Sequence, residues 1–135
     1  MTYFLDTNAI SALMRPVAAV ADQLARLAPS DVWLPQPAIA EIAYGIAALP
    51  VSKRRRWLEE RQALVMSGIQ HAEWTDDVSA AFGLIKAALE KRGERLADFD
   101  IAIAAHAVAA GGVLVTADRR HMPRVSGLKV EDWSQ

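Results

Sequence analysis

The sequence contains no cysteine, and this absence excludes several classes of chemistry together. Disulfide bonds, zinc sites with thiolate ligands and catalysis by a thiol are all ruled out. A long uninterrupted apolar run is also missing, because the longest candidate, from Ile101 to Ala117, contains His106 and two adjacent glycines. We therefore expect no membrane span. No cationic and apolar leader opens the sequence, so we expect a cytoplasmic location.

The chain has 135 residues, of which 53% are hydrophobic. This length fits one domain, and this hydrophobic fraction is enough for a buried core. No internal repeat, linker or low-complexity segment divides the sequence. We expect a single domain over residues 1–135.

Short apolar segments with the composition of strands alternate with segments of helical periodicity. The expected strands are 3–5, 32–34, 69–74, 113–115 and 128–130. The expected helices run from a cap at Asn8 to Arg15-Pro16, over 17–27 and 37–49, from Ser52 to Gly68, from Thr75 to Gly93, and over 99–110. This alternation predicts an α/β sandwich around a mostly parallel sheet of four to five strands.

Carboxylates stand where acidic residues are uncommon, inside or at the edges of apolar sequence. Glu41 is the only charged residue between Val32 and Ser52. Asp98 and Asp100 precede the uncharged stretch from Ile101 to Ala117, Asp118 follows it, and Asp6 follows the first expected strand. An ionised carboxylate in such surroundings is costly unless it is paired or binds a metal.

These acids also share a position in the expected fold. Asp6 and Asp118 follow strands, and functional groups of parallel α/β sheets gather at the carboxyl ends of the strands. Glu41 and Asp100 belong to helices that can reach the same rim. Several carboxylates at one place repel one another, and bound Mg²⁺ or Mn²⁺, which prefer oxygen ligands, would remove that repulsion. Each acid also has a structural alternative, as a helix cap, a first-turn acid, a turn residue or a solvated side chain.

The net charge of −1 gives no basic surplus of the kind typical of nucleic-acid-binding proteins. Setting aside the five acids named above, however, leaves 11 acidic residues against 15 Lys and Arg. Basic residues also cluster, at 53–56, at Arg92 and Arg95, and at Arg119, Arg120 and Arg124. Such runs equally suit solvated helices and loops. The near-neutral total therefore does not exclude RNA as a partner.

Four motifs resemble those of the PIN-domain family and, within it, the VapC-like toxins of type II toxin–antitoxin systems. They are residues 3–8 (YFLDTN), 41–46 (EIAYGI), 98–107 (DFDIAIAAHA) and 114–122 (LVTADRRHM). They occur in the family's order at similar spacing and together extend over nearly the whole chain.

The resemblance implies a three-layer α/β/α sandwich and an endoribonuclease that depends on Mg²⁺ or Mn²⁺ and is restrained by a cognate antitoxin. It maps the four family acids onto Asp6, Glu41, Asp100 and Asp118. Asp98 is then an accessory acid, and Thr7 or Asn8, with Thr116, resemble the polar residues that orient the acids. A homodimer and an apolar groove for an antitoxin helix are implied as well.

The expected reaction is hydrolysis of an RNA phosphodiester at one or two metal ions, bound by Asp6, Asp100 and Asp118 with Glu41 direct or through water. We expect Arg119, Arg120 and Arg124 to hold flanking phosphates. His106 is either a proton donor or a helix residue with a structural hydrogen bond, and His121 a donor or a surface residue.

Three other interpretations compete with the nuclease. A phosphatase that begins with strand-Asp-x-Asp lacks its second acid, because Asn8 stands there. A receiver domain needs a lysine after a late strand, where this sequence has Asp118. A catalytically degenerate adaptor that binds RNA or an antitoxin without cleavage stays open, and it predicts no cooperative metal binding by the acids.

Overall fold

A five-stranded parallel sheet forms the centre of the protein, which a computed structural model describes for residues 1–15 and 17–134. The strands are β1 Tyr3–Leu5, β2 Val32–Pro35, β3 Gln70–Ala72, β4 Val113–Val115 and β5 Lys129–Glu131. Their order in the sheet is β3-β2-β1-β4-β5, and every neighbouring pair is parallel. The predicted α/β class and parallel sheet are confirmed, and the number of strands is five.

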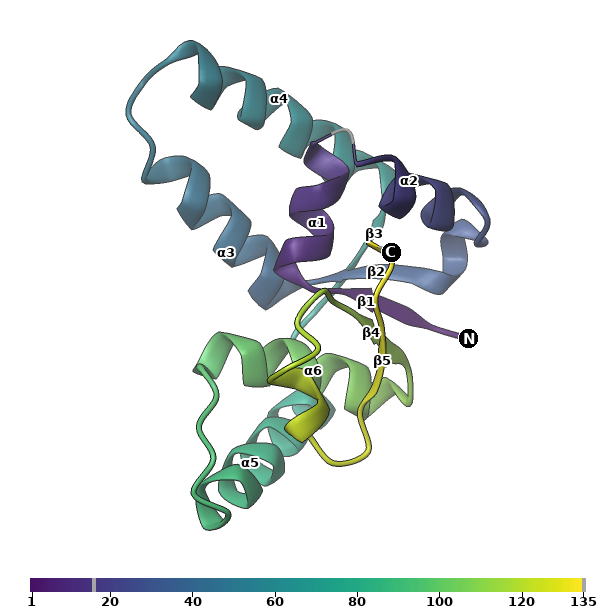
Figure 1. Ribbon diagram of the computed structural model, residues 1–135, viewed down its shortest axis with the longest axis vertical. Coiled ribbons are helices and arrows are strands. Elements are labelled where there is room, and N and C mark those ends of the chain that lie inside the picture. Colours follow the sequence, from purple (N-terminus) through teal and green to yellow (C-terminus); the bar gives the residue numbers. More distant parts are fainter. Residues whose placement is uncertain (16, 135) are drawn as a thin grey trace.

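Helices cover both faces of this sheet (Figure 1). One layer contains α1 Thr7–Met14, α2 Ala18–Ala25, α3 Gln36–Ala47 and α4 Lys53–Gly68, and the other contains α5 Asp76–Lys91 and α6 Asp98–Ala110. Two short 3-10 helices, Pro29–Asp31 and Met122–Arg124, lie in the connections. The expected three-layer α/β/α arrangement is therefore present.

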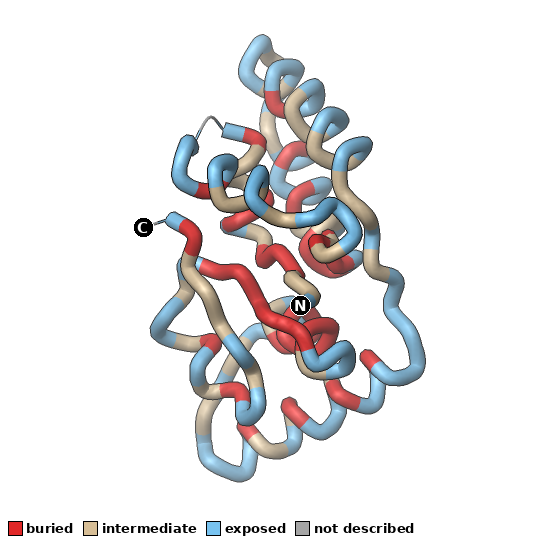
Figure 2. Tube along the Cα trace, turned by 90° about the vertical axis from the view of Figure 1, so that its right-hand side faces the viewer, coloured by how far each residue is buried: buried red, intermediate tan, exposed pale blue. Residues whose placement is uncertain are grey.

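The core lies between the sheet and the helices, and Figure 2 shows the buried segments running through the middle of the molecule. Leu5, Leu34 and Leu114 from the three central strands are fully buried. The seven residues 101–107 of α6 are all buried, so this helix is apolar on every side, as expected for a helix inside the fold. Within the described residues, no helix is long and apolar enough to cross a membrane.

The helices lie where they were predicted, with ends that differ by at most two residues, but the cap of α1 differs from the prediction. Ser52 and Thr75 cap α4 and α5 as predicted, since their hydroxyls accept hydrogen bonds from the N–H groups of Arg55 and Val78. The predicted cap of α1 is wrong. Asp6, not Asn8, is the N-cap of α1, because its Oδ1 accepts from the Thr7 N–H at 2.7 Å.

α6 begins at Asp98 and α3 at Gln36, each one residue earlier than predicted, while α2 and α3 end at Ala25 and Ala47, two residues earlier than predicted. The first helix ends at Met14, as expected before Arg15-Pro16, but Pro16 itself lies outside the described residues, as does Gln135 of the predicted domain.

Candidate active site

The four predicted acids line one pocket of about 500 Å³ at the carboxyl ends of the strands. Asp6 directly follows β1, and Asp118 follows β4, which is paired with β1. Glu41 lies in the middle of α3, which leaves the end of β2, and Asp100 lies in the first turn of α6. The sheet order therefore brings together side chains that are far apart in the sequence.

Asp6 is the deepest of the four acids and is only 4% exposed. Its Oδ1 accepts from the Thr7 N–H and its Oδ2 accepts from the Thr116 hydroxyl, both at 2.7 Å. Burial raises the pKa of Asp6, and the charges of Glu41 and Asp118 raise it further, while the two hydrogen bonds oppose this shift. The carboxylate is thus fixed in orientation while its negative charge remains poorly compensated.

Three polar side chains connect the acids into a network. The Thr7 hydroxyl donates to Glu41 Oε1 at 2.7 Å, which fixes the carboxylate of α3 against the start of α1. The Asn8 amide donates to Thr116 Oγ1 at 3.1 Å, while its oxygen accepts from the Ala117 N–H. The structure therefore places Thr7, Asn8 and Thr116 in contact with the acids or with one another.

Asp100 shows most clearly the effect of burial and of repulsion between the carboxylates of the pocket. Burial raises its pKa, and the charges of Asp6, Glu41 and Asp118 raise it further, to about 6. A carboxyl group with three acidic neighbours loses its proton reluctantly, since each neighbour disfavours the charged form. A cation among these groups would relieve that repulsion.

Asp118 differs from the other acids because local donors compensate its charge. Its Oδ1 accepts from the N–H groups of Arg120 and His121 at 3.1 and 2.9 Å. The His121 Nδ1 lies 3.2 Å from both carboxylate oxygens. Burial alone would raise the pKa of Asp118, but these donors outweigh it and hold the pKa below its ordinary value. His121 is therefore a partner of the fourth acid and more than a plain surface residue.

The donor set of the pocket suits a hard divalent cation in kind, because it consists of carboxylate oxygens with hydroxyl and amide groups behind them. As the side chains lie, no group of three or more His, Asp or Glu residues in 1–15 and 17–134 is already arranged to hold a metal ion. The raised pKa values of Asp6 and Asp100 indicate that negative charge there lacks a counter-charge. The residues fit Mg²⁺ or Mn²⁺ in chemistry.

Known proteins resemble this chain in sequence and in fold. The family model of the PIN domain matches residues 3–128. The chain belongs to the PIN-domain family. It is 25% identical to "Ribonuclease VapC2" of Rickettsia felis over 100% of both chains, and 28% identical to "tRNA(fMet)-specific endonuclease VapC" of Shigella flexneri over 99% of both.

A crystal structure of VapBC2 from Rickettsia felis, bound to a DNA fragment, has the same fold with a TM-score of 0.88. At 23% identity the match covers 98% of this chain and 99% of that one. The predicted family is thus confirmed, and the PIN fold accounts for the order of the strands.

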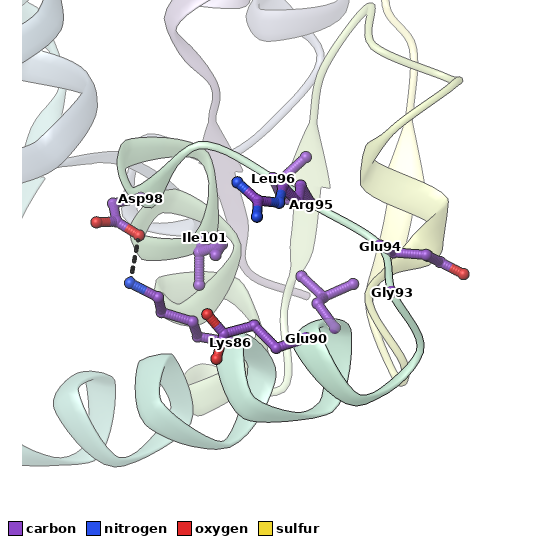
Figure 3. A pocket seen from close by; sticks show the side chains of 9 residues that line it. Lys86, Glu90, Gly93, Glu94, Arg95, Leu96, Asp98 and Ile101 are labelled. Carbon is purple, nitrogen blue, oxygen red and sulfur yellow. Dashed lines mark ion pairs between the residues drawn. The ribbon is translucent and has the colours of Figure 1, made fainter.

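Asp98 lies outside the acid pocket of this PIN domain, although it was expected to be accessory to the other acids. Its Oδ1 forms an ion pair with Lys86 Nζ of α5 at 3.0 Å, and Figure 3 shows the two side chains pointing toward each other. They line a different hollow, between the end of α5 and the start of α6. Residues two apart on an α-helix point in nearly opposite directions, so Asp98 and Asp100 cannot both turn toward the pocket.

The predicted RNA-binding arginines also lie outside the pocket lining. Arg119 and Arg120 are exposed in the loop that follows Asp118. The Arg124 Nε lies 4.0 Å from Glu94, and the Arg124 carbonyl accepts a hydrogen bond from Arg92. Arg124 therefore helps to hold its loop against the segment after α5.

His106 is a structural residue and not a member of the site. Its side chain is buried, it does not line the acid pocket, and its Nδ1 lies 2.9 Å from the Ala102 carbonyl one turn earlier in α6. Burial lowers the pKa of His106, so its neutral form is favoured.

Two basic residues of the pocket were not identified as part of the site from the sequence. Arg15, just after α1, and Arg54, in the first turn of α4, line it together with the four acids. Arg54 belongs to the basic run 53–56, which was noted as a cluster without a location. The sequence separation of residues 15 and 54 gives no sign that they line the same pocket, because this depends on the packing of α4 on α1.

Proposed function

We propose that this PIN-domain protein is an endoribonuclease that hydrolyses RNA phosphodiester bonds at the acid pocket with the help of a divalent cation. The observation that carries the proposal is the convergence of Asp6, Glu41, Asp100 and Asp118 in one pocket. The two relatives named as a ribonuclease and an endonuclease match the full length of the chain and support the same activity.

The cation is proposed to be Mg²⁺, with Mn²⁺ as a substitute. Asp6, Asp100 and Asp118 would hold it, with Glu41 direct or through water. When bound, such an ion increases the acidity of water and neutralises charge that develops on the phosphate.

The chain itself fixes the orientation of the carboxylates before a cation binds. Thr116 and the Thr7 N–H fix both oxygens of Asp6, and the Thr7 hydroxyl fixes Glu41. Side chains locked in this way need little rearrangement when ligand and substrate arrive. Arg119 and Arg120, exposed beside Asp118, are proposed to contact RNA phosphates, and Arg124 to support them.

The biological role that we propose is that of the toxin in a type II toxin–antitoxin system, acting in the cytoplasm. A cognate antitoxin and a second copy of the chain are the proposed protein partners. Apolar side chains exposed on α3 and α4 provide a surface for them, namely Tyr44, Trp57 and Leu64. The degenerate adaptor is not favoured, because all four family acids are present and line the same pocket.

The test is cleavage of a mixed set of tRNA, rRNA and mRNA by purified, antitoxin-free protein with Mg²⁺, Mn²⁺ or EDTA. We expect cleavage that EDTA abolishes and that Asp6→Asn and Asp100→Asn each reduce at least about a hundredfold, since both remove a charged ligand. Asp98→Asn is the matched control, because this acid is two residues from Asp100 but outside the pocket.

Retained cleavage in both pocket variants would contradict the proposal and indicate a contaminating nuclease. Equal loss in Asp98→Asn would contradict the assignment of the site to the pocket. Absence of cleavage of any RNA together with absence of cooperative metal binding would favour the degenerate adaptor over an enzyme.

A further inference from the structure

The acid pocket has a second wall whose chemistry differs from that of a metal site. Arg15 and Arg54 line it, and so do apolar side chains of α1, α3, α4 and the segment between α3 and α4. These are Met14, Ile42, Ile46, Leu49 and Leu58. Carboxylates that only bind a cation need neither an apolar wall nor two guanidinium groups. The wall therefore indicates a larger ligand that carries negative charge and apolar surface together.

Two other arginines of α4, Arg55 and Arg61, form hydrogen bonds with backbone carbonyls and differ in this from the two arginines of the pocket. Arg55 donates to the Leu49 carbonyl at 3.1 Å, which attaches the start of α4 to the segment that follows α3. Arg61 Nε donates to the Met14 carbonyl at 2.8 Å, which attaches α4 to the end of α1. These two arginines are structural and set the positions of Arg54 and Arg15.

Arg15 and Arg54 themselves are exposed. Within 1–15 and 17–134, neither guanidinium forms a hydrogen bond or an ion pair, including with the four acids of the pocket that it shares. The two guanidinium groups line the same pocket as the four carboxylates but do not pair with them. An anion can therefore bind to the guanidinium groups within this pocket. Guanidinium groups match the oxygens of a phosphate in geometry and charge.

The size of the pocket limits the form of the nucleic acid. A volume of about 500 Å³ is that of a site for a small ligand, so it admits one or two nucleotides of a single strand and excludes a duplex. Unpaired RNA can also turn a base out of its stack and place it on a protein surface, as sequence-specific RNA recognition usually does.

We propose that Arg15 and Arg54 bind the phosphates that flank the scissile bond of an unpaired RNA strand, whose base or ribose packs against Ile46, Leu49 and Leu58. This inference rests on the proposed ribonuclease function, because it assigns the substrate-binding part of the same pocket. The two arginines are substrate-binding residues in this scheme, and the carboxylates form the part of the pocket where hydrolysis is proposed to occur.

The experiment compares Arg15→Ala and Arg54→Ala with Arg56→Ala, which removes an exposed arginine of the same basic run that lies outside the pocket. The affinity for a labelled, unstructured single-stranded RNA is measured over a range of salt concentrations in an Asp6→Asn background, in which we expect no cleavage. Steady-state cleavage and Mn²⁺ binding by calorimetry are measured in the otherwise unchanged protein. Arg15→Lys and Arg54→Lys test whether charge alone suffices.

We expect each pocket variant to raise Kd and KM about tenfold, with kcat changed less than about threefold. Each should also flatten the slope of log Kd against log salt by about 0.7, the value for one phosphate contact on a single strand. The lysine variants should restore the slope, and Mn²⁺ affinity should not change in any of them.

RNA affinity and salt slopes equal to those of Arg56→Ala would overturn the inference. If the unmodified protein neither binds Mn²⁺ nor cleaves RNA, the proposed function fails. Loss of RNA binding in the pocket variants would even then support the phosphate contacts. Absence of any RNA binding by the starting protein would overturn both proposals.

Discussion

At the scale of the residue, Asp100 connects the acid pocket to the stability of the protein. Its ordinary pKa is 3.8, and the pKa in the folded protein is about 6. The folded state therefore binds this proton more tightly than the unfolded chain does. The group favours folding fully below pH 3.8, and this contribution is lost as the pH rises through 6.

We predict that Asp100→Asn increases the free energy of unfolding of the metal-free protein at pH 7.5 by about 1 kcal/mol. The full pKa shift corresponds to about 3 kcal/mol, which solvent screening of a half-exposed group reduces. Urea denaturation in EDTA at pH 7.5 and 4.5 measures the effect, which should fall to about a third at the lower pH. An equal gain at both pH values would show that charge repulsion is not its source.

The Thr116 hydroxyl is the single group that contacts the most parts of the site. It donates to Asp6 and accepts from the Asn8 amide and the Asp118 N–H. We predict that Thr116→Val, which keeps the shape and removes the hydroxyl, weakens Mn²⁺ binding and cleavage about 10- to 100-fold, the range for partners of metal ligands. Calorimetry and cleavage rates measure it, and Thr116→Ser should retain most of both. Unchanged metal affinity in Thr116→Val would contradict the proposal that the Thr116 hydroxyl orients the metal-binding carboxylates.

At the scale of the element, the turn from α6 into β4 depends on two glycines for different reasons. Gly111 has φ of 62°, a left-handed conformation that ends the helix. Gly112 lies against β1, and a Cβ atom there would be 2.7 Å from the Thr2 carbonyl oxygen and 3.0 Å from the Phe4 ring. The close approach of the α6–β4 turn to β1 therefore requires a residue without a side chain.

We predict that Gly112→Ala decreases the free energy of unfolding by about 2 kcal/mol, because backbone must move to admit the methyl group. Gly83 lies in the middle of α5, and within the described part of the chain no atom beyond the adjacent turns of its own helix lies within 4 Å of the place that an added methyl group would take. Gly83→Ala should therefore increase the free energy of unfolding by about 1 kcal/mol through helix propensity. Urea denaturation of both variants tests the pair. A neutral Gly112→Ala would show that this contact relaxes freely.

The elements themselves were largely predictable, because each strand is a short apolar run between clear helix signals. β1 and β4 agree with the prediction to the residue. The cap of α1 was not predictable. Asp6 and Asn8 are both good caps, and the choice depends on Thr116, which lies more than 100 residues later and binds both.

The acids of the candidate site were predictable for the same reason that the strands were, since each stands out against apolar sequence. The direction of Asp98 and the location of Arg15 and Arg54 were not. Asp98 turns toward Lys86 of another helix, and the two arginines depend on how α4 packs on α1. Such contacts leave no periodic signal in the sequence.

At the scale of the whole molecule, a cation that binds only the folded site must stabilise the entire fold. At a concentration one hundred times its Kd, this linkage contributes about 2.7 kcal/mol. We predict that Mn²⁺ raises Tm by about 10 °C in a single unfolding transition, as expected for one domain of this size. Calorimetric scans with and without the ion measure the shift, which Asp6→Asn should abolish. An equal shift in that variant would place the ion elsewhere.

The central position of β1 and β4 has a consequence for the way the acid pocket forms during synthesis of the chain. Asp6 follows β1, but the neighbouring strand β4 and the Thr116 hydroxyl that orients the Asp6 carboxylate are synthesised more than 100 residues later. A nascent or prematurely terminated chain would therefore carry Asp6 and Glu41 without the partners that complete the pocket. The order of the strands therefore prevents the acid pocket from forming until β4 and the residues that follow it have been synthesised.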